Sequence, residues 1–192
     1  FPAMLTAIGT ACHSINLSTY ILDKDAVGQR TISTLCAAAC SGVQVRVLVD
    51  GIGTSRAALS MAGALRKAGA KLTVFHPLLG LPMRRPGINL RNHRKLLIVD
   101  GKTGFTGGLN ITSSHFLSRW KKTPPVRDIH FRIEGPVVSS MQEVFALDWQ
   151  ISTGEVLDGP PFFPDTGMPG SALMRAIPSG PDEDLENIYE II

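Results

Sequence analysis

The sequence has few cysteines, no long apolar run and almost no excess of one charge. Its 3 cysteines are odd in number and include no Cys-x-x-Cys pair, which argues against a disulfide framework or a zinc site and favours the reduced thiols of a cytoplasmic protein. No apolar run reaches the roughly 18 residues that a membrane-spanning helix needs, so we expect the segment itself to be soluble. The formal net charge is only +3, and any attraction of anions must therefore depend on local groups.

The composition is that of a globular α/β domain. Hydrophobic residues make up 44% of the chain and charged residues 18%, which is enough for one sizeable core. Apolar periodicity and turn residues predict helices at residues 1–12, 25–41, 54–68 and 134–150, and strands at residues 14–22, 43–49, 71–75 and 126–133. Strands that alternate with helices favour an α/β sandwich with a mixed, largely parallel central sheet.

The most specific pattern lies in residues 92–111. It contains His93, Lys95, Asp100, Gly107, Gly108 and Asn110. We predict a buried strand at residues 94–99, a tight turn at Asp100, and a return strand at residues 103–106. Side chains two residues apart on a strand share a face and stand about 7 Å apart. One phosphate group would therefore touch both His93 and Lys95.

These residue types suit the capture and attack of a phosphate without a metal or another cofactor. A neutral imidazole is a nucleophile, a lysine ammonium neutralises phosphoryl oxygens, and an asparagine amide donates hydrogen bonds to them. Gly107 and Gly108 would let the ligand approach the backbone closely. A histidine at the start of a buried strand is usually structural. Here Lys95 would also face the core, and lysine is almost never buried without a partner.

The spacing of these residues resembles the signature of the phospholipase D superfamily. That signature reads His-x-Lys, four residues, Asp, six residues, Gly-Gly or Gly-Ser, one residue, Asn, and every fixed position matches in residues 93–110. The Gly-Gly variant, with Gly108 where many members have Ser, is similar to the first motif of bacterial cardiolipin synthases. The resemblance is to the amino-terminal half of such an enzyme.

The resemblance implies an α/β/α sandwich that forms one lobe of a pseudo-twofold enzyme. His93 would be the nucleophile that forms a phosphohistidine, with Lys95 and Asn110 as the phosphoryl clamp. Asp128 would accept the Nδ1 proton of His93 and leave Nε2 free to attack, although it would also suit a simple ion pair with a neighbouring base. Asp100 lies at the turn, where we expect it to fix backbone rather than touch substrate.

Enzymes of this superfamily bring two His-x-Lys motifs together, and this sequence has one. The other histidines and the residues two positions after them are His13 and Ile15, His76 and Leu78, His115 and Leu117, and His130 and Arg132. The chain is therefore expected to hold half an active site. The other half would come from a second lobe in cis or from a homodimer partner.

The composition changes after the predicted helix at residues 134–150. We assign residues 1–151 to the lobe with the motif and residues 152–171, which are rich in proline and glycine, to a linker. Residues 172–192 would begin a second, truncated lobe, with a short strand at residues 172–177 and a helix from residue 182.

Two loops are candidates for the border of the site. Residues 76–90 carry Arg84 and Arg85 beside several apolar side chains, so this loop is either a solvated connection, a surface packed on another domain, or a phosphate-attracting contact with a membrane interface. Asp50 and Ser55 follow a predicted strand and would border the cleft at its carboxyl end.

The expected function is that of a phosphatidyltransferase or phosphodiesterase acting on a phosphatidylglycerol-like phospholipid. Such a protein would sit peripherally on the cytoplasmic side of the membrane. One alternative is a dimeric single-motif nuclease that cleaves nucleic acid, which would show steeply salt-dependent binding. The other is a non-catalytic lobe that only binds anionic lipids.

Overall fold

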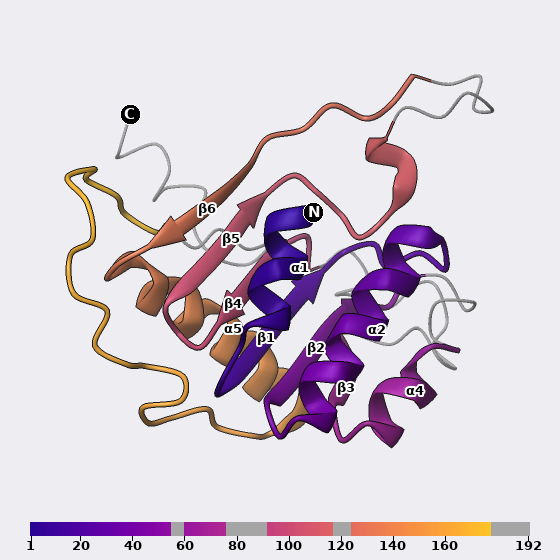
Figure 1. Cartoon of the computed structure of the whole chain (residues 1–192), viewed down its shortest axis with the longest axis horizontal. Coiled ribbons are helices and arrows are strands. Elements are labelled where there is room, and N and C mark those ends of the chain that lie inside the picture. Colours follow the sequence, from indigo (N-terminus) through magenta and orange to yellow (C-terminus); the bar gives the residue numbers. More distant parts are fainter. Residues whose placement is uncertain (55–59, 76–91, 117–123, 178–192) are drawn as a thin grey trace, which may run out of the picture.

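A six-stranded sheet forms the centre of the computed structural model, which describes residues 1–54, 60–75, 92–116 and 124–177 (Figure 1). The strands are β1 (Ser14–Thr19), β2 (Gln44–Asp50), β3 (Lys71–Phe75), β4 (Leu96–Val99), β5 (Thr103–Gly107) and β6 (His130–Glu134). Their order across the sheet is β3-β2-β1-β4-β5-β6. The α/β class and the mixed sheet predicted from the sequence are confirmed. The parallel pairing is limited to β1, β2 and β3. The pairs β1–β4, β4–β5 and β5–β6 are antiparallel, and for β4 and β5 the short hairpin turn between them allows no other pairing.

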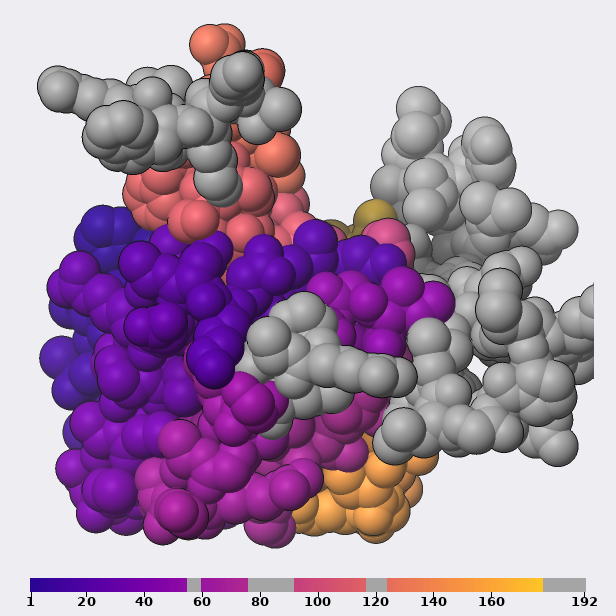
Figure 2. Space-filling model, turned by 90° about the vertical axis from the view of Figure 1, so that its right-hand side faces the viewer, coloured from indigo at the N-terminus to yellow at the C-terminus, as the bar shows by residue number. Residues whose placement is uncertain are grey.

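Helices cover both faces of this sheet. The helices α1 (Pro2–Gly9), α2 (Ala26–Cys40) and α4 (Ala62–Lys67) lie on one face, and α5 (Val137–Thr153) lies on the other (Figure 1). Figure 2 shows the two layers from the side, with α2 and α4 in indigo to magenta and α5 in orange. In β4 the side chains alternate between the two cores, Leu97 toward α1 and α2 and Ile98 toward α5. The lobe is thus an α/β/α sandwich with a core on each side.

Several boundaries differ from those predicted. The strand predicted to begin at residue 94 begins at Leu96, because side-chain contacts rather than a strand ladder hold residues 92–95. The last strand begins at His130, where its pairing with Gly107 starts. The final helix begins at Val137, since Gly135 has a φ of 99° that an L residue rarely adopts.

Residues 172–177 do not form the predicted strand. They pair with no strand of the described sheet, and most of their side chains are exposed. The preceding segment packs on the lobe, with Leu157 and Phe162 buried in the core beneath α5 and the Ser14 hydroxyl donating to the Pro161 carbonyl at 2.6 Å. The assignment of a linker and a second lobe stays a prediction, and the helix predicted from residue 182 lies outside the described residues.

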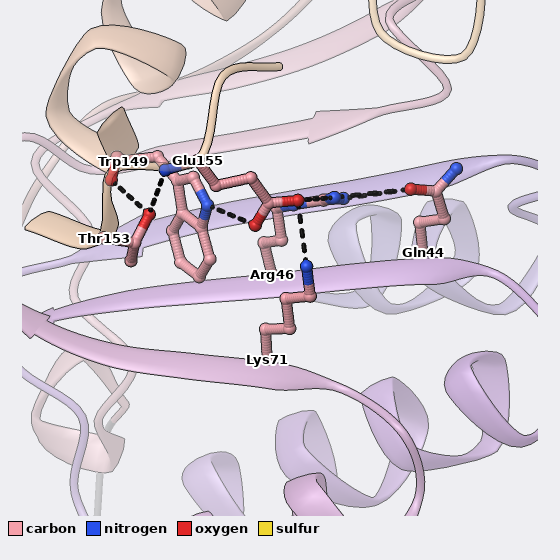
Figure 3. A network of polar contacts seen from close by, with 6 residues as sticks. All are labelled: Gln44, Arg46, Lys71, Trp149, Thr153 and Glu155. Atoms are coloured by element: carbon pink, nitrogen blue, oxygen red, sulfur yellow. Dashed lines mark hydrogen bonds and ion pairs between the residues drawn. The ribbon is translucent and has the colours of Figure 1, made fainter.

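Glu155 fastens the chain after α5 to the sheet (Figure 3). Its carboxylate accepts hydrogen bonds from Arg46 of β2 at 2.6 Å, from Lys71 of β3 at 2.9 Å and from the Trp149 indole at 2.9 Å. Burial alone would raise the pKa of Glu155, but these three donors outweigh it and lower the pKa to about 2. The Arg46 guanidinium, buried in the sheet, also lies 4.9 Å from the ring centroid of Phe162.

None of the helices in the described ranges has the length and apolar character required to cross a bilayer. The 3 cysteines are all free thiols.

Candidate active site

His93 and Lys95 lie in the irregular segment that leads into β4. The His93 side chain is exposed, and its ring centroid is 4.0 Å from that of Tyr20, which directly follows β1. Lys95 Nζ donates to the His93 carbonyl at 2.7 Å and lies 5.7 Å from the Tyr20 ring centroid, within the range of a cation–π contact. The two motif side chains are therefore brought together by Tyr20, not by a shared strand face as predicted.

A pocket of about 400 Å³ opens beside these two residues. Its lining comes from residues 93–96, from Thr106 and Gly107 of β5, from Met141 and Val144 of α5, and from residues 175–177. Burial lowers the pKa of Lys95, and the negative charge of Asp128 partly opposes this shift. An imidazole and a lysine ammonium thus line one pocket.

The residues on both sides of His93 are anchored to α5. Asn92 Nδ2 donates to Asp148 Oδ2 at 2.8 Å, and Arg94 Nη1 pairs with Asp148 Oδ1 at 2.5 Å. Asn92 and Asp148 are both buried. The Asn92 backbone amide also donates to Asp50 Oδ2 at 3.2 Å. The backbone around His93 is therefore held by side chains of α5 and β2.

Asn110 is held with its amide oxygen already engaged. Its Oδ1 accepts from the Ile21 backbone amide at 3.1 Å, and its own backbone amide donates to His115 Nε2 at 3.2 Å. An isolated bridge between Leu22 and Ile111 keeps these two segments together. The Nδ2 group makes no hydrogen bond to a described residue, and its role as a donor to phosphoryl oxygens stays a prediction.

The Asp128 side chain lies against Gly108. A Cβ on Gly108 would come within 1.8 Å of Asp128 Oδ1, and the only hydrogen bond that the Asp128 side chain makes within the described residues is to the Ile129 amide, at 3.0 Å. Its charge acts on Lys95 and on His130. The predicted bond from Asp128 to His93 is not among these contacts, so its orienting role stays a prediction.

His130 lines a small cavity together with Lys95, and both of its ring nitrogens are buried without a partner in the described residues. Burial lowers the pKa of His130, and the Asp128 charge partly opposes this. Burial therefore favours the neutral form of this imidazole. A Cβ on Gly107 would lie 2.9 Å from His130 Nδ1. The φ of Gly107 is 144°, a backbone conformation that residues with a Cβ rarely adopt.

The space beside Gly107 and Gly108 is filled by the segment of this chain that precedes β6. A Cβ on Gly107 would meet the Ile129 carbonyl oxygen at 2.2 Å, and the Gly108 amide donates to that oxygen at 2.9 Å. The close approach that Gly107 and Gly108 allow is therefore that of the segment before β6. Access of a ligand to their backbone stays a prediction.

Asp100 fixes the chain before β1. Its carboxylate accepts from the backbone amides of Cys12 at 2.9 Å, His13 at 2.7 Å and Ser14 at 2.9 Å. Its own φ is 53°, in the left-handed region. All three contacts are to backbone, at the end of β4 opposite His93.

The remaining predicted site residues divide between the described and the undescribed parts of the chain. Asp50 is buried and accepts from the backbone amides of Ile52 at 2.7 Å and Gly53 at 3.2 Å, besides that of Asn92. Ser55, Arg84 and Arg85 lie outside the described residues. Within the described ranges, no three His, Cys, Asp or Glu side chains converge as metal ligands.

Four residues of the site were not predicted from the sequence, namely Tyr20, His115, His130 and Asp148. Tyr20 directly follows β1, at the carboxyl end of a parallel strand, where ligands bind in open α/β sheets, so its position was a usable signal. Asp148 lies on α5 far along the chain from His93, and no local pattern links them.

Fold and site together define a lobe of the phospholipase D type. The chain matches the family model described as "Cardiolipin synthase, PLD-like domain" over residues 4–149, and it belongs to this family. It is 36% identical over 196 residues to the cardiolipin synthase of Geobacillus thermodenitrificans, with 100% of this chain and 38% of that protein covered. It is 38% identical over 190 residues to the major cardiolipin synthase of Bacillus subtilis, with 98% of this chain and 39% of that protein covered.

Solved structures agree on the fold. The phospholipase D family member Nuc from Salmonella typhimurium superposes with a TM-score of 0.57 at 23% identity, covering 79% of this chain and 87% of that one. The phosphatidylserine synthase of Haemophilus influenzae superposes with a TM-score of 0.58 at 16% identity, covering 87% and 37%. At these identities the likeness concerns the fold alone. The chain spans well under half the length of the two cardiolipin synthases.

Proposed function

We propose that this chain supplies half of the active site of a phosphatidyltransferase similar to a cardiolipin synthase. The observation that carries the proposal is the shared pocket of His93 and Lys95, in a chain 36% to 38% identical to two proteins named cardiolipin synthase. The substrate is a phosphatidylglycerol-like phospholipid.

In the proposed reaction, Nε2 of His93 attacks the phosphorus of this lipid. A P–N bond forms, the P–O bond to the head-group alcohol breaks, and the leaving alkoxide takes a proton from a second His-x-Lys lobe. An acceptor alcohol then attacks phosphorus, gives its proton to that lobe and releases His93. Water as the acceptor would give hydrolysis instead.

The charge that develops on the phosphoryl oxygens is met by Lys95 and by the Asn110 amide. Such donors act most strongly when they are held in place before the reaction, as Asn110 is by its bond to Ile21. The second lobe comes either from the same polypeptide or from a homodimer partner. Its histidine is the general acid that this chain lacks.

We further propose that the protein works at the cytoplasmic surface of a membrane. The lipid substrate requires contact with a bilayer, and Arg84 and Arg85 are the candidate contacts for its head groups. A nuclease or a purely lipid-binding role is not favoured, because the relatives with the same motif region are named cardiolipin synthases.

The test is transfer by the complete protein, with phosphatidylglycerol labelled at its phosphate. His93→Ala should remove both turnover and the acid-labile labelled adduct expected of a phosphohistidine. Lys95→Ala should slow transfer at least about a hundredfold, the usual loss for an electrostatic stabiliser. His13→Ala is the matched control, since its exposed side chain lies away from the pocket, and it should keep full activity. A near wild-type rate in His93→Ala would overturn the assignment.

A further inference from the structure

Arg175 lines the same pocket as His93 and Lys95. It belongs to the irregular segment that follows α5 and packs beside the pocket, far along the chain from the motif. Its side chain is exposed, and it makes no hydrogen bond or ion pair to the described residues. A cation with no carboxylate partner among the described residues therefore lines the space where the proposed chemistry occurs.

The charge balance of the pocket is positive. Its described lining contains no carboxylate, and the other arginine in it, Arg94, is paired with Asp148 at 2.5 Å. Lys95 and Arg175 remain as the charges available to a ligand. A concave site lined by charge of one sign concentrates ligands of the opposite sign, so this pocket favours an anion.

One part of the pocket wall is apolar. It is formed by Leu96 of β4, Met141 and Val144 of α5, and Ile177. A small hydrophilic anion would leave this wall in contact with water, whereas a phosphate ester with an aliphatic part would cover it. The combination of cations and apolar side chains matches the boundary between a lipid head group and its acyl chains.

We propose that Arg175 is a phosphate-binding residue of this pocket, and that it selects phospholipids without a cationic head group. The inference rests on the proposed function. A guanidinium offers two parallel donors to one phosphate, which a second ammonium beside Lys95 would not. The same positive charge repels the ammonium of a zwitterionic head group, so Arg175 favours phosphatidylglycerol over phosphatidylcholine.

The test compares wild type, Arg175→Gln and Arg175→Lys in the complete protein, with vesicles of phosphatidylglycerol or of phosphatidylcholine. Arg175→Gln should raise KM for phosphatidylglycerol about tenfold, the loss of one charge-assisted contact, with a much smaller change in kcat. Its preference for phosphatidylglycerol over phosphatidylcholine should fall by a similar factor. Arg175→Lys should restore part of the KM and part of the lipid preference, because lysine supplies the positive charge but not the two parallel donors of the guanidinium. Arg66→Gln, an exposed arginine on α4, is the matched control and should change neither.

Inhibition by inorganic phosphate separates binding of the phosphate from binding of the lipid surface. If Arg175 contacts the phosphate, the inhibition constant should rise in Arg175→Gln together with KM. An unchanged inhibition constant, or an unchanged KM and lipid preference in an active Arg175→Gln enzyme, would overturn the inference and leave the proposed function intact. Absence of His93-dependent transfer in the wild type would instead defeat the proposed function. Thermal unfolding should be unchanged in all variants, since both arginines are exposed.

Discussion

The carboxylate of Asp148 pairs with Arg94 at 2.5 Å, and it thereby fastens the residue after the candidate nucleophile to α5. The same carboxylate accepts from Asn92, the residue before His93, at 2.8 Å. One buried side chain thus holds both neighbours of the imidazole. A rigid attachment of this kind limits the motion of a nucleophile, and small misplacements of reacting groups are costly in rate.

Asp148→Ala should therefore lower kcat by about tenfold or more, with little change in KM, because the chemistry loses its alignment while the pocket cations remain. The variant should also be less stable by about 1 to 3 kcal/mol, since buried donors lose their acceptor. Steady-state kinetics and chemical denaturation measure the two effects. Asp165→Ala, at an exposed position, should show neither. An unchanged kcat in Asp148→Ala would mean that the contacts of Asp148 with Asn92 and Arg94 do not position His93.

Asp128 is the second residue whose role kinetics can assign. Its charge raises the pKa of Lys95 against the lowering effect of burial. Asp128→Asn should therefore lower the pKa of Lys95 further, so that the alkaline limb of the pH–rate profile moves to lower pH. The measurement is kcat/KM from neutral to alkaline pH.

The same profile tests the orienting role predicted for Asp128. If Asp128 also fixes the tautomer of His93, Asp128→Asn should lose activity at every pH, because Nε2 would no longer be kept free. A shift of the alkaline limb with an unchanged plateau would restrict Asp128 to electrostatics. A profile identical to that of the wild type would exclude both roles.

The sequence predicted the fold well because its signals are local. The alternation of apolar and polar residues and the turn at Asp100 are read within short windows, and the class and most elements are confirmed by the sheet order. The strand predicted at residues 172–177 is wrong for the same reason. A short apolar run becomes a strand only when a neighbour offers its backbone groups, and no strand of the described sheet does so here.

The site was predicted less completely, since its supporting contacts join distant parts of the chain. The motif spacing placed His93 and Lys95 together, and they line one pocket, while the place of Asn110 beside them stays a prediction. The predicted strand geometry between His93 and Lys95 is replaced by packing on Tyr20. The contact of Asp148 with Asn92 spans 56 residues of sequence. Such a pair depends on how α5 crosses the sheet, which no local pattern specifies.

The two glycines of the motif should respond differently to the same substitution. Gly107→Ala places a Cβ 2.2 Å from the Ile129 carbonyl at a φ of 144°, so backbone must shift, at a cost of about 1 to 3 kcal/mol. In Gly108→Ala the new Cβ would lie 1.8 Å from Oδ1 of Asp128. The Asp128 side chain is exposed and can rotate away. We expect a clear loss of thermal stability in Gly107→Ala and little in Gly108→Ala.

Activity gives a second readout for this pair. Gly108→Ala displaces Asp128 without unfolding the loop, so its pH–rate profile should resemble that of Asp128→Asn. Differential scanning fluorimetry and the pH profile together check the prediction. Equal destabilisation of the two variants would contradict the contacts described for Asp128 and Ile129.

The contacts of Glu155 predict how stability depends on pH. The pKa of Glu155 is lowered from 4.5 to about 2 in the folded protein, so its stabilising effect is fully present above the unfolded value and is lost as the pH falls toward about 2. Glu155→Gln should remove this part of the acid dependence and, near neutral pH, destabilise the protein by about 2 kcal/mol, because the buried Arg46 loses its charged partner. Lys71→Gln should cost at most about 1 kcal/mol, since its side chain is 59% exposed. Urea denaturation from pH 3 to pH 7 measures both variants, and an acid dependence that is the same in Glu155→Gln and wild type would show that Arg46 and Lys71 do not hold this carboxylate in solution.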